Sequence, residues 1–321
     1  MEQEKKNFCQ VSLARNIPII IENYYSFKKL YRLFNIFIIC PKNEINEFRT
    51  RLNFEEINII DEDTIISFKD FSKIFEESNG SIKYKDSFKE RLGWYYQQIL
   101  KISFVLNFIN SKKENIIIWD ADTVILKKIC FFKNNKSVKY GNFFEYHKDY
   151  YETNKEILSE VPKYFISFLN QFIAISINEC HFFLKNYLKY NFNEKNLGLI
   201  VSKLIFKSVF NRHKIYKGSL FSEYELLGQS NYIFDNVKQK PILFLRFGLN
   251  GKLTITQKIF AKKLGYKHVT YEHGHISKNN SGILNRKQSW TGFLKIIFKN
   301  FTKFYLKCII HEFMYNLNKL K

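Results

Sequence analysis

Short apolar runs alternate with amphipathic stretches along the first half of the chain. Four such runs predict buried strands, at residues 8–13, 35–40, 57–60 and 116–119. Apolar residues at helical spacing predict the helices between them, at residues 24–34, 44–52 and 88–107. Because strands that alternate with helices pair mostly in parallel, this half predicts a mostly parallel central sheet flanked by helices.

The second half, from about residue 138, has a less regular pattern. Residues 165–177 contain an apolar segment that we expect to return to the sheet as a strand, and residues 241–246 predict another strand. Residues 181–190 and 197–210 predict helices. No internal repeat or low-complexity linker divides the chain, so we expect one α/β domain with a C-terminal extension.

The C-terminal extension, residues 286–321, has the pattern of a basic amphipathic helix. Its lysines recur every fourth residue, at Lys295, Lys299, Lys303 and Lys307. A basic helix rich in aromatic residues suits an anionic membrane interface. The same pattern equally suits a terminal helix that packs on the body with its lysines outward, and the sequence leaves both interpretations open.

Composition and charge narrow the function classes. With 321 residues and 45% hydrophobic residues the chain is globular, and its formal net charge of +21 attracts polyanions. A nucleic-acid-binding protein is a weaker alternative, because the charge is spread along the chain and no known nucleic-acid-binding motif is present. The five scattered cysteines fit a reducing compartment, and neither a signal peptide nor a spanning segment is predicted. We therefore expect a cytoplasmic protein, and the membrane interpretation of the C-terminal helix would place it peripherally on the inner face of the cytoplasmic membrane.

Two aspartates directly follow the most apolar strand. Residues 116–119 (IIIW) lead into Asp120-Ala121-Asp122, a position that opens into the ligand crevice of α/β sheets. Two carboxylates at this position are suited to bind Mn²⁺ or Mg²⁺, and the bound cation can in turn bind a diphosphate. A phosphatase of the haloacid-dehalogenase type, with Asp120 as nucleophile, is an alternative, although the later acidic pair that such enzymes use is missing. A turn with surface aspartates is the purely structural alternative.

Three motifs give the chain its resemblance to a known class of enzymes. They are Gly93-Trp94…Gln97-Gln98…Lys101, then Asp120-x-Asp122, then Ser222-Glu223-Tyr224-Glu225. Over roughly residues 8–275 the chain resembles glycosyltransferases of the GT-A fold, and more narrowly a group of bacterial glycosyltransferase-like proteins. The resemblance implies a GT-A-like, Rossmann-like catalytic domain at residues 1–285. It also implies sugar transfer from a nucleotide-diphosphate donor, UDP-sugar favoured, to a surface glycan or lipid-linked glycan such as lipopolysaccharide or capsule.

The helix before the two aspartates is the expected donor-binding element. The helical spacing lets four residues share a face, Trp94, Gln97, Gln98 and Lys101. Glutamine can bind sugar hydroxyls and lysine can bind phosphates. The structural alternative puts Trp94 in the core and Lys101 in solvent. The expected donor-binding residues are Arg15, Arg91, Gln97, Gln98, Lys101 and Asp120.

The third motif supplies the candidate catalytic base. A transferase that inverts configuration needs a carboxylate to deprotonate the acceptor hydroxyl, and Glu223 and Glu225 are the candidates, with Glu223 preferred. The structural alternative is a capping box, in which Ser222 caps a helix and Glu225 occupies its third position.

A late histidine pair is the candidate supplement to the metal site. His273 and His275 follow a strand-like stretch at residues 268–271, and the glycine between them lets the loop approach a diphosphate. Imidazole suits Mn²⁺ better than Mg²⁺, so we expect Asp120 and Asp122 together with His273 or His275 as metal ligands. A structural histidine is the alternative.

Overall fold

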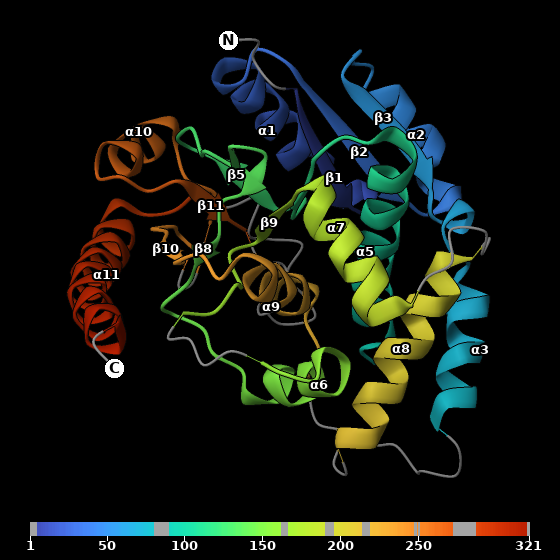
Figure 1. The fold of residues 1–321 in the computed structure, drawn as a ribbon. Helices are drawn as coiled ribbons and strands as arrows, with labels where there is room; N and C mark the ends of the chain where they lie inside the picture. The colour runs from blue at the N-terminus through green and yellow to red at the C-terminus, as the bar shows by residue number, and fades with distance from the viewer. Residues whose placement is uncertain are drawn as a thin grey trace.

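A five-stranded sheet forms the centre of the molecule, and helices cover both of its faces (Figure 1). The computed structural model describes residues 5–79, 90–161, 166–189, 196–213, 219–246, 249, 251–271 and 287–319. The strands lie in the order β3-β2-β1-β4-β9, and only β9 runs antiparallel to its neighbour. Their bounds are Lys6–Val11 for β1, Phe34–Cys40 for β2, Ile57–Asp61 for β3, Ile116–Trp119 for β4 and Phe172–Ile175 for β9. This architecture confirms the predicted α/β fold class.

Alternation along the strands divides the core into two layers. Neighbouring residues point to opposite faces, so Ile118 packs in one layer and Ile117 in the other. The helices α1 and α2 cover the Ile117 face, and α3, α5, α7, α8 and α9 cover the Ile118 face. The helix bounds are Ile17–Leu30, Ile45–Arg51, Phe68–Asn79, Leu92–Lys112, Ile177–Phe183, Leu197–Arg212 and Glu223–Asp235, in that order.

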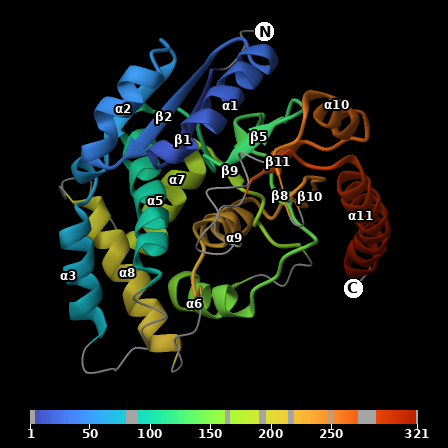
Figure 2. The same ribbon diagram turned by 180° about the vertical axis from the view of Figure 1, so that it is seen from behind.

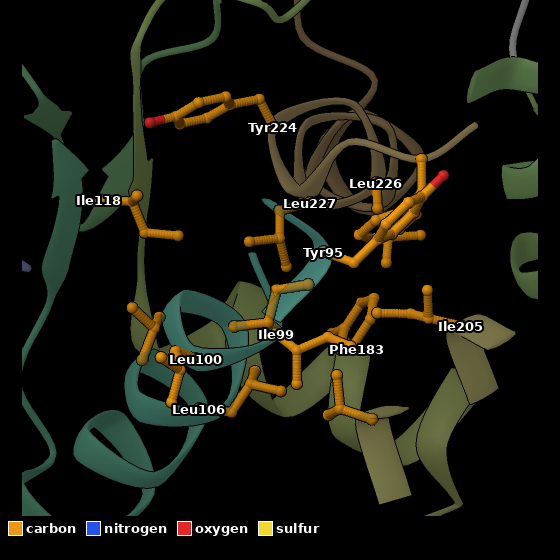
Figure 3. Close-up of a cluster of buried hydrophobic side chains, with 14 of the residues drawn as sticks. Tyr95, Ile99, Leu100, Leu106, Ile118, Phe183, Ile205, Tyr224, Leu226 and Leu227 are labelled. Carbon is orange, nitrogen blue, oxygen red and sulfur yellow. The ribbon is translucent and has the colours of Figure 1, made fainter. Parts of the chain in front are cut away.

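Two helices from distant parts of the chain meet over the end of β4. Figure 3 shows Ile99 of α5 close to Leu227 of α9, and Ile99, Leu100 and Leu227 belong to the same buried cluster as Ile118. The burial of these side chains, each at most 1% exposed, fixes α5 and α9 beside the strand. The packing therefore brings the middle of α5 and the first two turns of α9 to the end of β4.

Several predicted elements shift or shorten. The helix predicted at residues 24–34 begins at Ile17, where Pro18 suits a first helical turn, and ends at Leu30. The strand predicted at residues 241–246 is wrong over most of its length. Only its first residue lies in a strand, Lys240–Pro241 (β10), which pairs with Tyr140–Gly141 (β8), and Leu245 forms a single isolated bridge with Val269. The strand expected within residues 165–177 is β9, which returns to the sheet as predicted, and the structure pairs it antiparallel with β4.

The C-terminal elements pack around a small second sheet. Strand β5, Thr123–Ile125, pairs antiparallel with β11, His268–Thr270. Helices α10, Ile255–Lys263, and α11, Trp290–Lys319, lie together at one edge of the molecule in Figures 1 and 2. Among the side chains of α11 that the structure describes, the buried ones are Phe293, Ile297, Phe304 and His311, and the first three join the apolar cluster of β5 and β11.

The packing of these side chains fixes the described part of α11 against the body of the protein. The helix is bound to the body through its apolar stripe, as one of the two interpretations proposed, but not all its lysines point outward. Lys307 Nζ donates a hydrogen bond of 2.6 Å to the carbonyl oxygen of Phe143 on the body. Within the described residues, no helix combines the length and apolarity needed to cross a membrane. The division into residues 1–285 and 286–321 remains a prediction.

Candidate functional site

The turn after β4 is held by backbone hydrogen bonds on both sides. The Asp120 amide donates to the carbonyl oxygen of Gln171 at 2.9 Å, and the Thr123 amide donates to that of Asp120 at 3.0 Å. The Asp122 carbonyl accepts from the amide of Tyr271 at 2.9 Å. Both aspartates are half-buried. The turn is therefore fixed between β9 and β11 at the carboxyl edge of the sheet, where ligands bind in open α/β folds.

Lys101 lies between two carboxylates next to this turn. Its Nζ is 2.5 Å from Asp120 Oδ1 and 2.7 Å from Glu223 Oε1, and its side chain is only 5% exposed. Burial lowers the pKa of a lysine, but here the two carboxylates outweigh it and hold the Lys101 pKa above its ordinary value. Lys101 is therefore a buried ammonium group, and the alternative of a solvent-exposed Lys101 is wrong.

Tyr224 completes this group of side chains, which we call the Lys101 cluster (Lys101, Asp120, Glu223 and Tyr224). The Tyr224 hydroxyl donates to Asp120 Oδ1 at 2.6 Å, and its ring centroid lies 5.1 Å from Lys101 Nζ. Burial raises the Tyr224 pKa well above its ordinary value, and the nearby Asp120 and Glu223 carboxylates raise it further. Tyr224 therefore stays a neutral hydrogen-bond donor to Asp120.

Gln98 and Gln171 support the cluster from either side. The Glu223 amide donates to Gln98 Oε1 at 3.0 Å, which places the first turn of α9 against α5. With its amide oriented to satisfy both neighbours, Gln171 donates to Asp120 Oδ2 at 2.8 Å and accepts from Arg246 at 2.9 Å. Asp120 thus accepts hydrogen bonds at both carboxylate oxygens. A carboxylate engaged in this way is poorly suited to attack phosphorus, the step that the phosphatase alternative requires.

Glu223 and Glu225 have different surroundings although both are buried. Burial raises the Glu223 pKa, and the Lys101 ammonium opposes that change. Glu225 lies outside the Lys101 cluster: its carboxylate accepts from the Ser167 hydroxyl, from the Phe168 amide at 3.0 Å and from Gln229 at 3.2 Å. Glu225 therefore anchors the segment before β9 to α9.

The capping-box alternative is wrong in part. Helix α9 does begin at Glu223 with Ser222 as its N-cap, but the Ser222 side chain makes no capping hydrogen bond. The box fails because the Glu225 side chain binds Ser167 and Phe168 instead of turning back to the Ser222 amide. A long-range contact has overridden the local one.

The burial of Glu225 predicts a pH-dependent stability. Burial raises its pKa from 4.5 to about 7, so the folded state binds the proton more tightly and Glu225 favours folding most below pH 4.5. This contribution is lost as the pH rises to 7, and it amounts to about 3 kcal/mol. We expect Glu225→Gln to reduce the fall in unfolding free energy between pH 5 and pH 8 by about that amount, as measured by urea denaturation. The exposed Glu55→Gln is the control, and an unchanged pH dependence in Glu225→Gln contradicts the assignment.

The other predicted site residues lie in several places. Arg15 is exposed on the short helix Ala14–Asn16 that follows β1, at the same sheet edge as Asp120. Arg91 is exposed before α5 and donates to Ser219 Oγ at 2.6 Å, and Gln97 is half-buried on α5. His273 and His275 lie outside the described residues. The structure thus brings Gln98, Lys101, Asp120 and Glu223 into contact.

One supporting residue was not predicted from the sequence. Gln171 precedes β9 and has a positive φ of 65°, which is uncommon for a residue other than glycine. Its only sequence signal is the polar Asn170-Gln171 pair in front of an apolar run. Arg246, which Gln171 contacts, also forms an ion pair with Glu145. The contacts through Gln171 therefore connect Asp120 to residues far along the chain.

The donor set at the turn fits a hard divalent cation that takes few protein ligands. Asp120 Oδ2 keeps one lone pair beyond its bond to Gln171, and Asp122 contributes a second carboxylate two residues on. Mg²⁺ in particular retains several waters and binds phosphate oxygens beside one or two carboxylates. Among the residues that the structure describes, no three histidine, cysteine, aspartate or glutamate side chains gather into a metal site.

The comparisons with known proteins give one family and several distant structural similarities. A family model described as a family of unknown function, DUF6492, matches residues 12–227. No curated protein matches the chain. The LgtC galactosyltransferase with donor and acceptor sugar analogs is 8% identical with a TM-score of 0.44, covering 91% of this chain and 95% of that one.

Two further solved structures are similar at the same level. Mouse xyloside xylosyltransferase 1 is 11% identical with a TM-score of 0.40, covering 85% of this chain and 99% of that one. PaToxG glycosyltransferase is 14% identical with a TM-score of 0.35, covering 82% and 75%. With TM-scores below 0.5, these similarities assign no activity to this chain, so the functional inference rests on the residues of its own site.

Proposed function

Since the chain belongs to DUF6492, a family of unknown function, we propose its activity from its site: transfer of a sugar from a nucleotide-diphosphate donor to a bacterial surface glycan. One observation carries this proposal. Asp120 and Asp122, with one residue between them, lie at the carboxyl end of the interior strand β4, and a buried ammonium group holds Asp120 in place. A pair of carboxylates at that edge is suited to a cation-bound diphosphate.

We propose that Asp122 and Asp120 Oδ2 hold Mn²⁺ or Mg²⁺. When bound, the cation supplies positive charge to the diphosphate leaving group. With Glu223 ionised, the charges of Asp120, Asp122, Glu223 and Lys101 sum to −2, which is complementary to a divalent cation. His273 and His275 are the proposed additional ligands from the segment after β11.

The roles of the remaining residues follow from their positions. Lys101 and Tyr224 orient Asp120, and Gln98 orients the first turn of α9. We propose Glu223 rather than Glu225 as the base, because Glu223 shares Lys101 with Asp120 whereas the hydrogen bonds of Glu225 tie it to the segment before β9. Arg15, Arg91 and Gln97 are the proposed contacts to the nucleotide, with a UDP-sugar as the favoured donor.

A thermal-shift assay with a panel of nucleotides and nucleotide sugars tests the donor site. We expect one nucleoside diphosphate and its sugar conjugate to raise the melting temperature only in the presence of Mn²⁺ or Mg²⁺, since a bound ligand stabilises the folded state. Asp120→Ala is expected to abolish that shift. A panel without any metal-dependent response would contradict the proposal, and hydrolysis of simple phosphate esters without an acceptor would favour a phosphatase.

We also propose that α11 makes a peripheral contact with an anionic membrane. Of the thirteen large apolar side chains exposed among the described residues, six lie on α11. The helix carries five lysines and one glutamate. Phe298, Tyr305 and Ile309 lie on one exposed face, with Lys295 and Lys299 beside them.

Co-sedimentation with phosphatidylglycerol vesicles measures this membrane contact. We expect Phe298→Asp with Ile309→Asp to weaken binding at least tenfold, because the double variant places charge on the apolar face. Tyr25→Asp, at an exposed site on α1, is the matched control. Equal sedimentation of the double variant and the wild type would exclude α11 as the contact.

A further inference from the structure

A groove lies apart from the Lys101 cluster, between α1, β5 and α10. This groove has a volume of about 560 Å³, within the range of small-molecule sites. Its floor is apolar and consists of buried side chains, Val124, Ile125, Leu126 and Leu253. An apolar floor of this size favours a hydrocarbon ligand.

The rim of the groove is strongly cationic. Four lysines line it, Lys29 of α1 together with Lys252, Lys258 and Lys262, and they face a single carboxylate, Glu22. Glu22 already binds two of them: its Oε2 is 2.8 Å from Lys252 Nζ, and its Oε1 binds Lys258 Nζ. With four lysines and one glutamate, the lining has a formal charge of +3. Lys252 and Lys258 form the ion pairs with Glu22, and the other two lysines of the rim are Lys29 and Lys262. An occupant with an anionic group complements this rim.

Helix α10 adds exposed apolar side chains to the same groove. Ile255 and Ile259 are four residues apart, so they share a helix face, and they are 76% and 50% exposed. When a ligand's hydrocarbon chain covers exposed aliphatic side chains beside an apolar floor, apolar surface leaves water, and this favours binding. The groove thus combines cations and apolar surface in one site.

We propose that this groove binds a single-chain anionic amphiphile, an alkyl or isoprenyl phosphate. Its phosphate lies at Lys29 and Lys262, and its chain lies over Ile255, Ile259 and the floor. Val124 follows Asp122 by two residues, so the floor begins within about 7 Å of Asp122 along the strand. This proximity makes the amphiphile the lipid carrier of the acceptor glycan, a role that rests on the proposed sugar transfer, whereas the binding site itself does not.

Isothermal titration with dodecyl phosphate below its micellar concentration tests the site. We expect saturable binding with one ligand per chain, weakened at least tenfold in Lys29→Glu with Lys262→Glu and in Ile255→Ser with Ile259→Ser. Lys69→Glu with Lys73→Glu, at exposed positions on α3, is the matched charge control and is expected to bind as the wild type does. Inorganic phosphate and dodecyl maltoside are both expected to bind at least tenfold more weakly, because each provides only half of the ligand's chemistry.

Four results would overturn the proposal. They are absence of saturable binding, equal binding of dodecyl maltoside, equal binding of inorganic phosphate, and wild-type affinity in both groove variants. If dodecyl phosphate does not bind and the groove variants also lose binding to anionic vesicles, the groove contacts a bilayer and not a single amphiphile. The metal-dependent nucleotide shift of the groove variants is measured in parallel. If the nucleotide shift is present but dodecyl phosphate does not bind, only the groove site is refuted. If the wild type binds dodecyl phosphate but shows no metal-dependent nucleotide shift, only the donor site is refuted.

Discussion

Replacing Lys101 with methionine is expected to lower the free energy of unfolding by about 3–5 kcal/mol at pH 8, the usual effect of removing one partner of a buried ion pair. Methionine keeps most of the apolar volume of the lysine stem but leaves Asp120 and Glu223 without their cation. Both carboxylates must then remain ionised in a poorly hydrated site or take up protons. Urea denaturation with a two-state fit measures the change.

The pH dependence separates this electrostatic effect from lost packing. In Lys101→Met the folded state binds a proton at Glu223 more tightly than the unfolded chain does, because burial raises the Glu223 pKa and the Lys101 ammonium no longer opposes that change. The deficit relative to the wild type is therefore largest at pH 8 and shrinks as the pH falls toward 5, since stability rises with falling pH wherever the folded state binds more protons. A cavity or packing defect would give the same deficit at both values.

Two variants control this experiment. Lys101→Met with Glu223→Gln removes one of the two orphaned charges and is expected to recover part of the stability at pH 8. Lys73→Met, at a side chain that is 73% exposed and 3.8 Å from Glu77, is expected to stay within about 0.5 kcal/mol of the wild type. A Lys101→Met protein as stable as Lys73→Met at pH 8 would show that Lys101 is not the buried counter-ion of these carboxylates.

The parts of the fold with strong local signals were predicted from the sequence. Strand β4 begins and ends at the predicted residues, because its apolar run IIIW is buried on both faces. Helix α3, Phe68–Asn79, was not predicted, although its apolar residues Phe71, Ile74 and Phe75 recur at helical spacing. Periodicity alone would have identified it.

The contacts of the site depend on long-range packing that local patterns do not record. Lys101 binds Glu223 across 122 residues of sequence, so a lysine on an otherwise apolar helix gives no sign that it is buried. Glu225 has the spacing of a capping residue, yet its carboxylate binds Ser167 and Phe168. On α11 the lysine repeat suggested an outward basic face, but Lys307 contacts the body while Ile309 is 68% exposed.

Asp122→Asn is expected to reduce transferase activity at least about 100-fold, comparable to removing one preorganised group that stabilises transition-state charge. The amide keeps the size of the side chain and removes the charge that would hold the cation, so the Mn²⁺ concentration for half-maximal activity is also expected to rise. A substitution at Asp122 distinguishes an effect on catalysis from an effect on stability better than a substitution at Asp120 does. Asp120 is a direct partner of the buried Lys101, so a change there would also alter stability, whereas Asp122 lies outside the Lys101 cluster.

The assay is sugar transfer from the donor that the thermal-shift panel identifies, over a range of Mn²⁺ concentrations. Asp63→Asn, at an exposed carboxylate just beyond β3 on the same sheet edge, is the matched control and is expected to keep near-normal activity. Unchanged unfolding of Asp122→Asn shows that lost activity is not lost fold. Near-normal activity of Asp122→Asn at saturating Mn²⁺ would remove Asp122 from the metal site, and with it the charge balance of −2 on which the proposed donor site depends.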